Sequence, residues 1–345
     1  MTSGQAPGEP VVRSLLAEDA APHVGAAFAD VRSASRAAVN PSGPHHLAHF
    51  SGSVYDFEVD IIDACPPATS APPSRLRADC RRTGRLLSAA VEDLDDDLRA
   101  AASGALIRVV LHAEKGAFCC DSIVPGRHVV GVVFDRAADQ VLSAQVMVRS
   151  CDEVVAVLAT EQRRRLSLGT QNPGGFALSA ADARTGHGTG TDKVHIARET
   201  AADLPSGRLA EVEAACVHAV APADLHYVAL HTDRATALLV DCMDHDDVSR
   251  FFTQTSVSDR RAFYRRFGRG LPHLVGRFTR LTAPVIGTRL MRVVLDLEQG
   301  AIYYYRLGQG RYLVGVTLDQ AEVAAADEKV AELAVRCQEV LAGGR

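Results

Sequence analysis

The residues best suited to chemistry are arginines that recur every four positions in two parts of the chain. They are Arg77, Arg81 and Arg85 in the first half, and Arg261, Arg265 and Arg269 in the second. On a helix this spacing places each set along one side, where guanidinium groups can bind carboxylates or phosphates. Between residues 258 and 292 there are nine arginines and one acid, Asp259, with four aromatic residues interleaved. Such a stretch attracts an acidic protein surface, an anionic lipid or a nucleic acid.

Two interpretations of these arginines stay open. In the simpler one they form a solvated flank whose methylene stems cover apolar surface. In the other they form a partner-binding surface, and its candidate residues are Arg261, Tyr264, Arg265, Arg266, Arg269, Arg77, Arg81, Arg82 and Arg85. Acidic runs at 92–97 and 244–247 offer the same arginines a partner within the chain or in a homodimer.

A second candidate site lies on a strand that alternates strictly between apolar and acidic residues. Over residues 54–61 the acidic side chains are Asp56, Glu58 and Asp60. A hairpin turn at 51–53 would place His46 opposite Glu58, and a histidine beside a carboxylate can bind a divalent metal or transfer protons. We expect instead that this acidic face is exposed to water, with His46 and Glu58 as a remote candidate metal site.

The remaining composition predicts a soluble cytoplasmic protein without a cofactor. The 345 residues are 47% hydrophobic and carry a net charge of -5, which excludes a generally basic nucleic-acid coat. The eight cysteines form no CxxC pair, and we expect reduced, buried thiols. We find no catalytic or nucleotide-binding signature, no secretory leader and no apolar run of membrane-spanning length.

The elements that position these residues are duplicated. Residues 74–135 align without a gap on residues 258–319, an offset of 184, with 23 identities in 62 positions. The matches include the arginines and Gly84, which recurs as Gly268. A glycine in the middle of a helix costs about 1 kcal/mol relative to alanine. Its presence in both copies therefore predicts a close approach between the helix and a neighbouring element.

Each copy follows the order α-β-β-α-β-β-β-α, which predicts an α+β fold with two tandem five-stranded antiparallel sheets flanked by helices. In the first copy we expect helices at 24–38, 74–101 and 145–158, a hairpin at 46–62, and strands at 106–113, 117–123 and 128–134. In the second we expect helices at 206–220, 248–280 and 323–341, a hairpin at 225–240, and strands at 289–297, 301–307 and 312–318. The helix at 248–280 should break at Pro272.

This order, together with one stretch of sequence, resembles the Roadblock (dynein light chain) family, which belongs with the longin- and profilin-like folds. The stretch is 287–316, where Leu290, Val293, Val294 and Leu295 lead into Glu298-x-Gly300-Ala301, a hairpin, Gly310 and Val314-Gly315-Val316. Residues 104–132 repeat it more weakly. The resemblance implies no catalytic residues. It implies a domain that pairs with other proteins and often scaffolds or regulates small GTPases.

These observations predict a flexible segment at 1–20, Roadblock-like repeats at 21–159 and 206–345, and a linker rich in Gly, Thr and Arg at 160–205. We expect a non-catalytic scaffold or regulator that works through protein contacts or self-association, with a small GTPase as one candidate partner. The alternative is a module that binds nucleic acid or another polyanion through the arginine-rich helix of the second repeat.

Overall fold

The chain is an α+β protein in the computed structural model, which describes residues 15–64, 71–135, 144–175, 193–199, 206–232, 235–287, 289–308 and 310–342. Spatial contacts divide it into two compact units. Unit 1 comprises 1–93, 109–171 and 278–289, and unit 2 comprises 94–108, 172–277 and 290–345. Because each unit takes a short segment from the other half of the sequence, its limits differ from the repeat bounds 21–159 and 206–345, which stay a prediction about the sequence.

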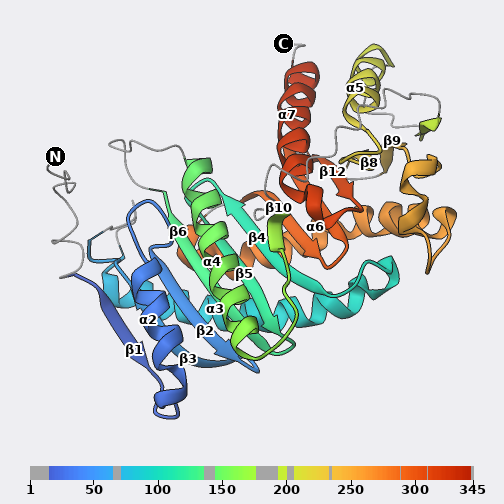
Figure 1. Cartoon of the computed structure of the whole chain (residues 1–345). Helices are drawn as coiled ribbons and strands as arrows, with labels where there is room; N and C mark the ends of the chain where they lie inside the picture. The colour runs from blue at the N-terminus through green and yellow to red at the C-terminus, as the bar shows by residue number, and fades with distance from the viewer. Residues whose placement is uncertain are drawn as a thin grey trace, which may run out of the picture. The chain divides into compact units, whose positions relative to one another are not determined.

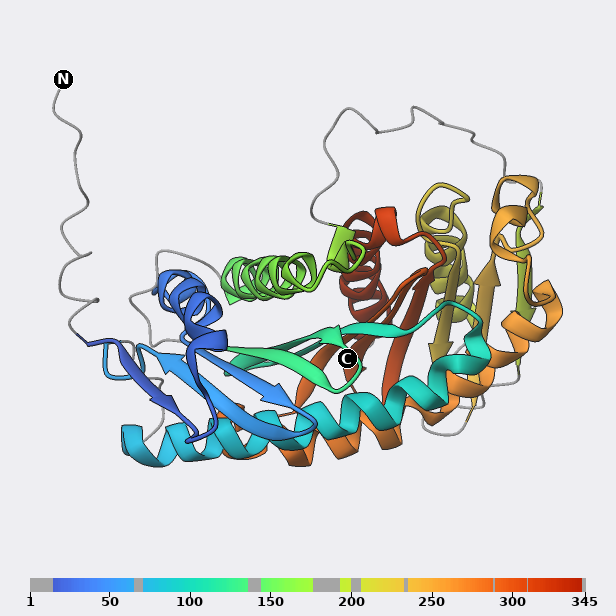
Figure 2. The same cartoon turned by 60° about the horizontal axis from the view of Figure 1, so that its bottom comes forward.

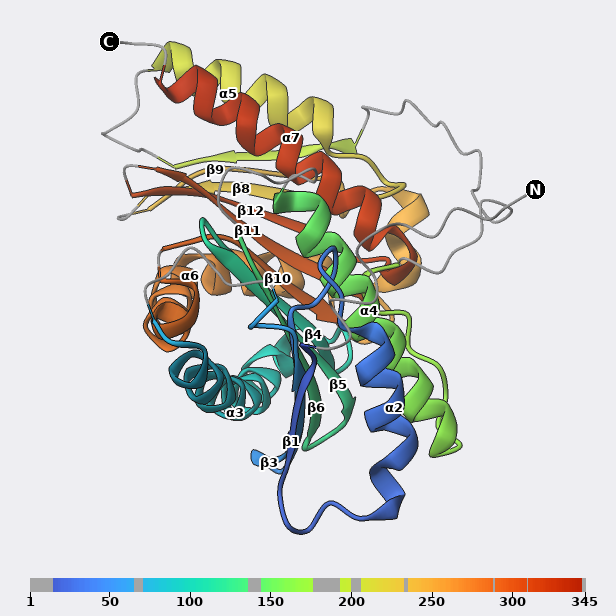
Figure 3. The same ribbon diagram turned by 90° about the vertical axis from the view of Figure 1, so that its left-hand side faces the viewer.

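Unit 1 is built on a sheet with the strand order β1-β3-β2-β6-β5-β4. Its strands are β1 (Ala17–Ala20), β2 (His46–Ser51), β3 (Val54–Asp60), β4 (Leu106–Ala113), β5 (Gly116–Val124) and β6 (Arg127–Phe134). Its helices are α2 (Ala29–Ala38), α3 (Pro73–Leu98) and α4 (Ala144–Arg165). Helix α3 covers one face of the sheet, and α2 and α4 cover the other (Figures 2 and 3).

Unit 2 repeats this arrangement with the strand order β7-β9-β8-β12-β11-β10. Its strands are β7 (His195–Arg198), β8 (Tyr227–His231), β9 (Thr236–Asp241), β10 (Leu290–Leu297), β11 (Gly300–Gly308) and β12 (Arg311–Thr317). Its helices are α5 (Ser206–Ala219), α6 (Val257–Ile286) and α7 (Val323–Ala342). Helix α6 packs on one face, and α5 and α7 pack on the other (Figures 1 and 3).

Each unit's set of strands has one strand more than the five predicted, and the layout of two separate five-stranded sheets is not confirmed. The additional strands are β1 and β7, which pair antiparallel with β3 and β9 at the edge of their sheets. β1 lies within the segment predicted to be flexible, and β7 lies within the predicted linker, as does the end of α4 at 160–165. Linker residues 166–175 are also described, whereas 176–192 and 200–205 lie outside the described residues, as do residues 1–14.

The two matched glycines lie where each long helix crosses its sheet, which confirms the predicted close approach. A Cβ added at Gly84 of α3 would lie 2.8 Å from the Phe50 ring on β2. A Cβ added at Gly268 of α6 would lie 2.7 Å from Nε2 of His231, the corresponding residue on β8. Only glycine leaves room for these rings, so the duplication preserves a packing contact at the cost of helix propensity.

The predicted break at Pro272 was wrong, because α6 continues through it to Ile286. A proline inside a helix has no N–H, so the carbonyl four residues earlier loses its partner. Here that carbonyl belongs to Gly268, and the Tyr312 hydroxyl of β12 donates a hydrogen bond to it at 3.0 Å. The side chain of a neighbouring strand therefore satisfies the group that Pro272 leaves unpaired.

Candidate functional site

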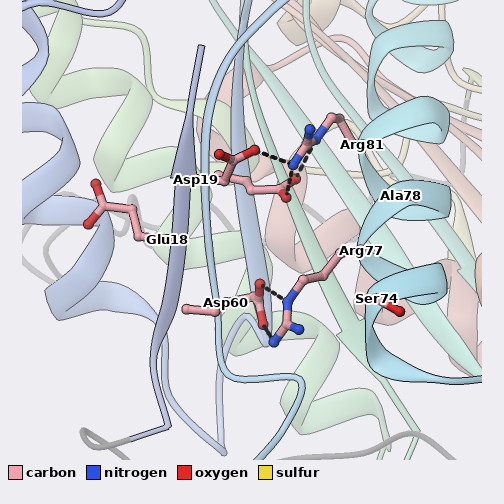
Figure 4. A pocket seen from close by; sticks show the side chains of 9 residues that line it. Glu18, Asp19, Asp60, Ser74, Arg77, Ala78 and Arg81 are labelled. Carbon is pink, nitrogen blue, oxygen red and sulfur yellow. Dashed lines mark hydrogen bonds and ion pairs between the residues drawn. The ribbon is translucent and has the colours of Figure 1, made fainter. Parts of the chain in front are cut away.

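The acidic strand of unit 1 faces α3, and the helix arginines bind it. Arg77 donates two hydrogen bonds to Asp60, from Nε at 2.7 Å and from Nη2 at 2.8 Å (Figure 4). The same Nη2 contacts Asp63 at 2.5 Å. Asp60 is 1% exposed, so this bidentate pair is shielded from solvent on the carboxylate side. The pair anchors the start of α3 to the end of β3.

One turn later, Arg81 makes a second set of ion pairs. Its Nη2 contacts Glu58 Oε1 and Asp19 Oδ2, each at 2.5 Å (Figure 4). Its guanidinium carbon also lies 4.2 Å from the centre of the Tyr55 ring, a cation–π distance. A cavity of about 410 Å³ opens between α3 and the sheet edge here. Its charged walls are these paired groups. The carboxylate of Glu18 points to the other side of β1 (Figure 4), where it binds Arg32 and Arg36.

The hairpin pairs His46 with Asp60 and not with Glu58 as predicted, but the side chains of His46 and Glu58 still meet diagonally in the interior. His46 Nε2 donates to Glu58 Oε2 at 3.2 Å, and both residues are 1% exposed. The expectation of a water-facing acidic strand was therefore wrong, because α3 covers that face. Burial opposes ionisation of Glu58, but hydrogen bonds from His46 and Arg81 outweigh it and lower its pKa to about 2. Such a carboxylate is a weak base at neutral pH.

Metal binding at this position finds no support. Across the residues that the structure describes, no group of three His, Cys, Asp or Glu side chains is arranged to hold a metal ion. The two nearest arginines also compete for the carboxylates, since Arg81 already contacts both oxygens of Glu58.

Unit 2 repeats the first arginine site. Arg261 donates to Asp241 from Nε at 2.6 Å and from Nη2 at 2.7 Å, and its Nη2 also contacts Asp244 at 2.7 Å. In each unit the same buried aspartate also accepts a backbone N–H two residues later, from Ile62 in unit 1 and Met243 in unit 2. Asp60 and Asp241 are 181 positions apart. The duplication therefore extends through the hairpin, where equivalent residues are three positions closer in sequence than in the region aligned at an offset of 184.

The other predicted partner-binding residues divide into three groups. Arg265 and Arg269 both contact Glu199, beside β7, and Arg269 also donates to Thr236 at 3.1 Å. Tyr264 is 1% exposed and lies in the interior of unit 2, so it is not part of a surface. Arg82, Arg85 and Arg266 are exposed, as is Arg269 despite its ion pair. Most of these arginines thus face acids of their own unit.

A groove in unit 2 is lined by the outer side of α6. Its volume is about 440 Å³, and its lining comes from residues 263–277 of α6 and from the segment 94–100. The rings of Phe263 and Phe267 stack at 5.6 Å, nearly parallel at 13°, and Leu271 and Leu274 extend the apolar floor. Arg266 lies on the rim, with its guanidinium carbon 5.9 Å from the Phe263 ring centre. The sequence analysis identified the aromatic and basic residues of this helix, but it did not predict that they line a groove.

Two further clusters were missed. In unit 1, Asp56 accepts hydrogen bonds from His49 at 2.6 Å, His23 at 2.8 Å and Ser51 at 2.7 Å. Burial raises the pKa of Asp56, but these hydrogen bonds outweigh it, so the pKa lies below its usual value. His49 has no counterpart in the second copy, where Leu230 stands, so the duplication gave no signal for this cluster.

The other cluster surrounds a buried histidine that is present in both units. This histidine connects the start of the hairpin to the end of the neighbouring strand. Nδ1 of His45 accepts the N–H of Phe134 at 3.0 Å, and Nδ1 of His226 accepts the N–H of Leu318 at 3.1 Å. In unit 2, Nε2 donates to the carbonyl of Pro222 at 3.1 Å. His45 and His226 are 181 positions apart. An alignment of the two repeats that allowed the offset to change from 184 to 181 would have shown that they are equivalent.

Comparisons with protein-family models, curated proteins and solved structures gave no significant match. No described helix is both long enough and apolar enough to span a bilayer. The seven described cysteines are buried and unpaired, and Cys65 lies outside the described residues.

Proposed function

We propose that the chain is a non-catalytic scaffold or regulator that works through protein contacts. In this proposal both units derive from one five-stranded Roadblock-like domain, and each has gained an edge strand. The observation that carries it is a contrast between the inside and the outside of the duplicated units. Several interior contacts recur at equivalent residues, whereas the exposed positions of the long helix differ between α3 and α6.

The repeated interior includes polar contacts that hold helix to sheet. The bidentate pair of Arg77 with Asp60 recurs as Arg261 with Asp241. The glycine contact of α3 recurs in α6 against the equivalent strand residue. These contacts give the spaced arginines a structural role, because they hold each helix to its sheet. The exposed side of each helix can therefore differ between the repeats without loss of the fold.

The outward positions of the two helices differ in charge and size. Leu86 and Asp93 of α3 are exposed and stand where α6 has the exposed residues Gly270 and Arg277. Such divergence on a common interior is what selection for different binding partners produces, because surface residues set specificity while core residues set the fold.

The polar groups of unit 1 support binding over acid–base chemistry. Glu58, the carboxylate nearest a histidine in the cavity beside α3, has a pKa of about 2 and is held by Arg81 and His46. A catalytic base works best with a pKa near the operating pH. Glu58, His46 and Arg81 therefore suit a structural role that holds α3 to the sheet better than a catalytic one.

The partner class to test first is the small GTPase, because the resemblance to the Roadblock family implies it, and we place the protein in the cytoplasm, where buried thiols stay reduced. The alternative, polyanion binding, is weakened by the pairing of Arg261, Arg265 and Arg269 with acids of their own unit. Those pairs cancel much of the positive charge that the sequence suggests.

The intact chain can be tested by biolayer interferometry against purified small GTPases loaded with GDP or a GTP analogue, alongside light scattering for self-association. The proposal predicts a complex with a GTPase or a homodimer at micromolar concentration. A chain that remains monomeric and binds no GTPase, but binds heparin with steep salt dependence, would establish the polyanion alternative instead.

A further inference from the structure

We propose that the groove on the outer side of α6 binds an acidic amphipathic helix of a partner protein. This inference rests on the proposed function and names the contact surface and the chemistry of its ligand. The groove residues on α6 recur at helical spacing: Phe263, Phe267, Leu271 and Leu274. Over residues 263–277 this stripe runs for about 21 Å at 1.5 Å per residue. A groove of this length along a helix suits a second helix laid beside it.

The floor of the groove calls for an apolar anchor. Phe263 and Leu271 are buried beneath it, while Phe267 and Leu274 are partly exposed. Leu94 adds a further apolar surface from the opposite wall. One or two leucine or phenylalanine side chains of the ligand would cover this surface, and the hydrophobic gain is about 25 cal/mol for each Å² removed from water.

The rim of the groove calls for acidic groups. Arg266 and His273 are exposed on the α6 side, and Asp97 is the one acid among the lining residues. A ligand helix with carboxylates one turn from its apolar anchors would pair with these groups. A nucleic acid is a poorer match, because its phosphates lack the apolar side chains that the floor accommodates, and the nearby Arg265 and Arg269 are occupied by Glu199.

The first repeat provides the internal control, because its helix lacks the groove residues. At the positions equivalent to Phe263, Phe267 and Leu274, α3 carries Asp79, Thr83 and Ala90. Arg82 is the counterpart of Arg266, and both are exposed. The inference therefore assigns the aromatic and basic contacts to α6, with the end of α3 and the residues that follow it, 94–100, as the opposite wall.

The test uses the intact chain and a fluorescein-labelled peptide with leucine at helical positions i, i+3, i+4 and i+7 and glutamate at the others. A second peptide carries lysine in place of glutamate, and a single-stranded DNA oligonucleotide serves as a polyanion. Binding is measured by fluorescence anisotropy for the native chain, Arg266→Glu and the matched control Arg82→Glu. Arg266→Gln is included as a milder change, and circular dichroism verifies that each variant is folded.

We expect the glutamate peptide to bind the native chain, and Arg266→Glu to weaken it at least about tenfold, because a charge reversal places like charges together at the contact. Arg82→Glu should leave the affinity within about twofold, since distant sites act independently. The inference is overturned if the glutamate peptide does not bind, if Arg82→Glu weakens it equally, or if DNA or the lysine peptide binds as tightly. A GTPase complex that is insensitive to Arg266→Glu would leave the proposed function standing and remove the groove as its site.

Discussion

Replacing Gly268 with alanine tests the contact between α6 and its sheet against ordinary helix propensity. An added Cβ would lie 2.7 Å from Nε2 and 3.0 Å from Cε1 of His231. That ring has little room to move, because it is buried, stacks on Tyr312 at 5.0 Å and contacts the Thr236 hydroxyl at 3.3 Å. Forcing a methyl group into such a site costs about 1–3 kcal/mol.

The matched control is Gly270→Ala, two residues later on the same helix. Gly270 is exposed, and nothing lies within 4 Å of the position its Cβ would take. Both substitutions gain the same helix propensity, up to about 1 kcal/mol, so that contribution cancels when the variants are compared. The remaining difference is the clash with His231, and Gly268→Ala should be less stable than Gly270→Ala by about 1–3 kcal/mol.

Urea denaturation followed by circular dichroism at 222 nm measures this difference. We expect Gly270→Ala to unfold at a higher urea concentration than the native chain, and Gly268→Ala to unfold at a lower concentration than Gly270→Ala. Equal midpoints for the two variants would refute the close approach and, with it, the explanation for glycine at this position in both repeats.

Three further substitutions test the buried polar groups. Burial, with Arg269 nearby, lowers the pKa of His231 to about 3, so the unfolded chain takes up a proton below about pH 6.5 that the folded chain refuses until about pH 3. The free energy of unfolding should therefore fall with decreasing pH in this window by up to about 1.4 kcal/mol per pH unit. His231→Phe gives unit 2 the residue type that unit 1 has at the equivalent position, Phe50, and should make the urea midpoint less dependent on pH. An unchanged pH dependence would contradict the assignment to His231. Asp241→Asn should lower stability by about 3 kcal/mol, because it strips a buried carboxylate from Arg261. Asp244→Asn, at a residue whose side chain is 54% exposed, should cost at most about 1 kcal/mol; equal shifts in thermal melting would contradict the distinction.

The order of helices and strands followed from local patterns, and the structure contains every element that the patterns predicted. The strands that were not predicted are β1 and β7, which are four residues each. A strand this short has too few positions for a periodic pattern, and it exists because an edge of the sheet is available for pairing. Information about that edge lies in β3 and β9, distant in the sequence.

The acidic strand shows a different limit of sequence reasoning. Alternation placed Glu58 and Asp60 on one face of β3, but it could not show that α3 would cover that face. It also missed a bulge between β2 and β3, which places Tyr55 with Glu58 beside Arg81 and turns Asp56 towards His49. The arginines at 77 and 81 are the residues that make burial of Asp60 and Glu58 tolerable, since a buried charge needs a partner. Each half of these pairs was recognised in the sequence, and only the tertiary fold joined them.

The groove of unit 2 could not be predicted from the sequence, because its two walls are distant along the chain and only the tertiary fold brings them together. Its aromatic and basic residues on α6 were identified, but the opposite wall comes from the segment 94–100 in the first half of the chain. Tyr264 was predicted as a partner-binding residue, but it is 1% exposed, and its burial does not fit that role. A comparison of the two repeats would have shown that Phe263 and Phe267 stand where the first repeat has Asp79 and Thr83.

Hydrogen–deuterium exchange with and without the glutamate peptide tests most directly whether the chain binds proteins through the outer side of α6. The account predicts that peptide binding slows exchange of backbone amides in residues 263–277 of α6 and leaves the equivalent residues 79–93 of α3 unchanged. Slower exchange confined to residues 79–93, or no change in either helix at a peptide concentration that saturates binding, would contradict it.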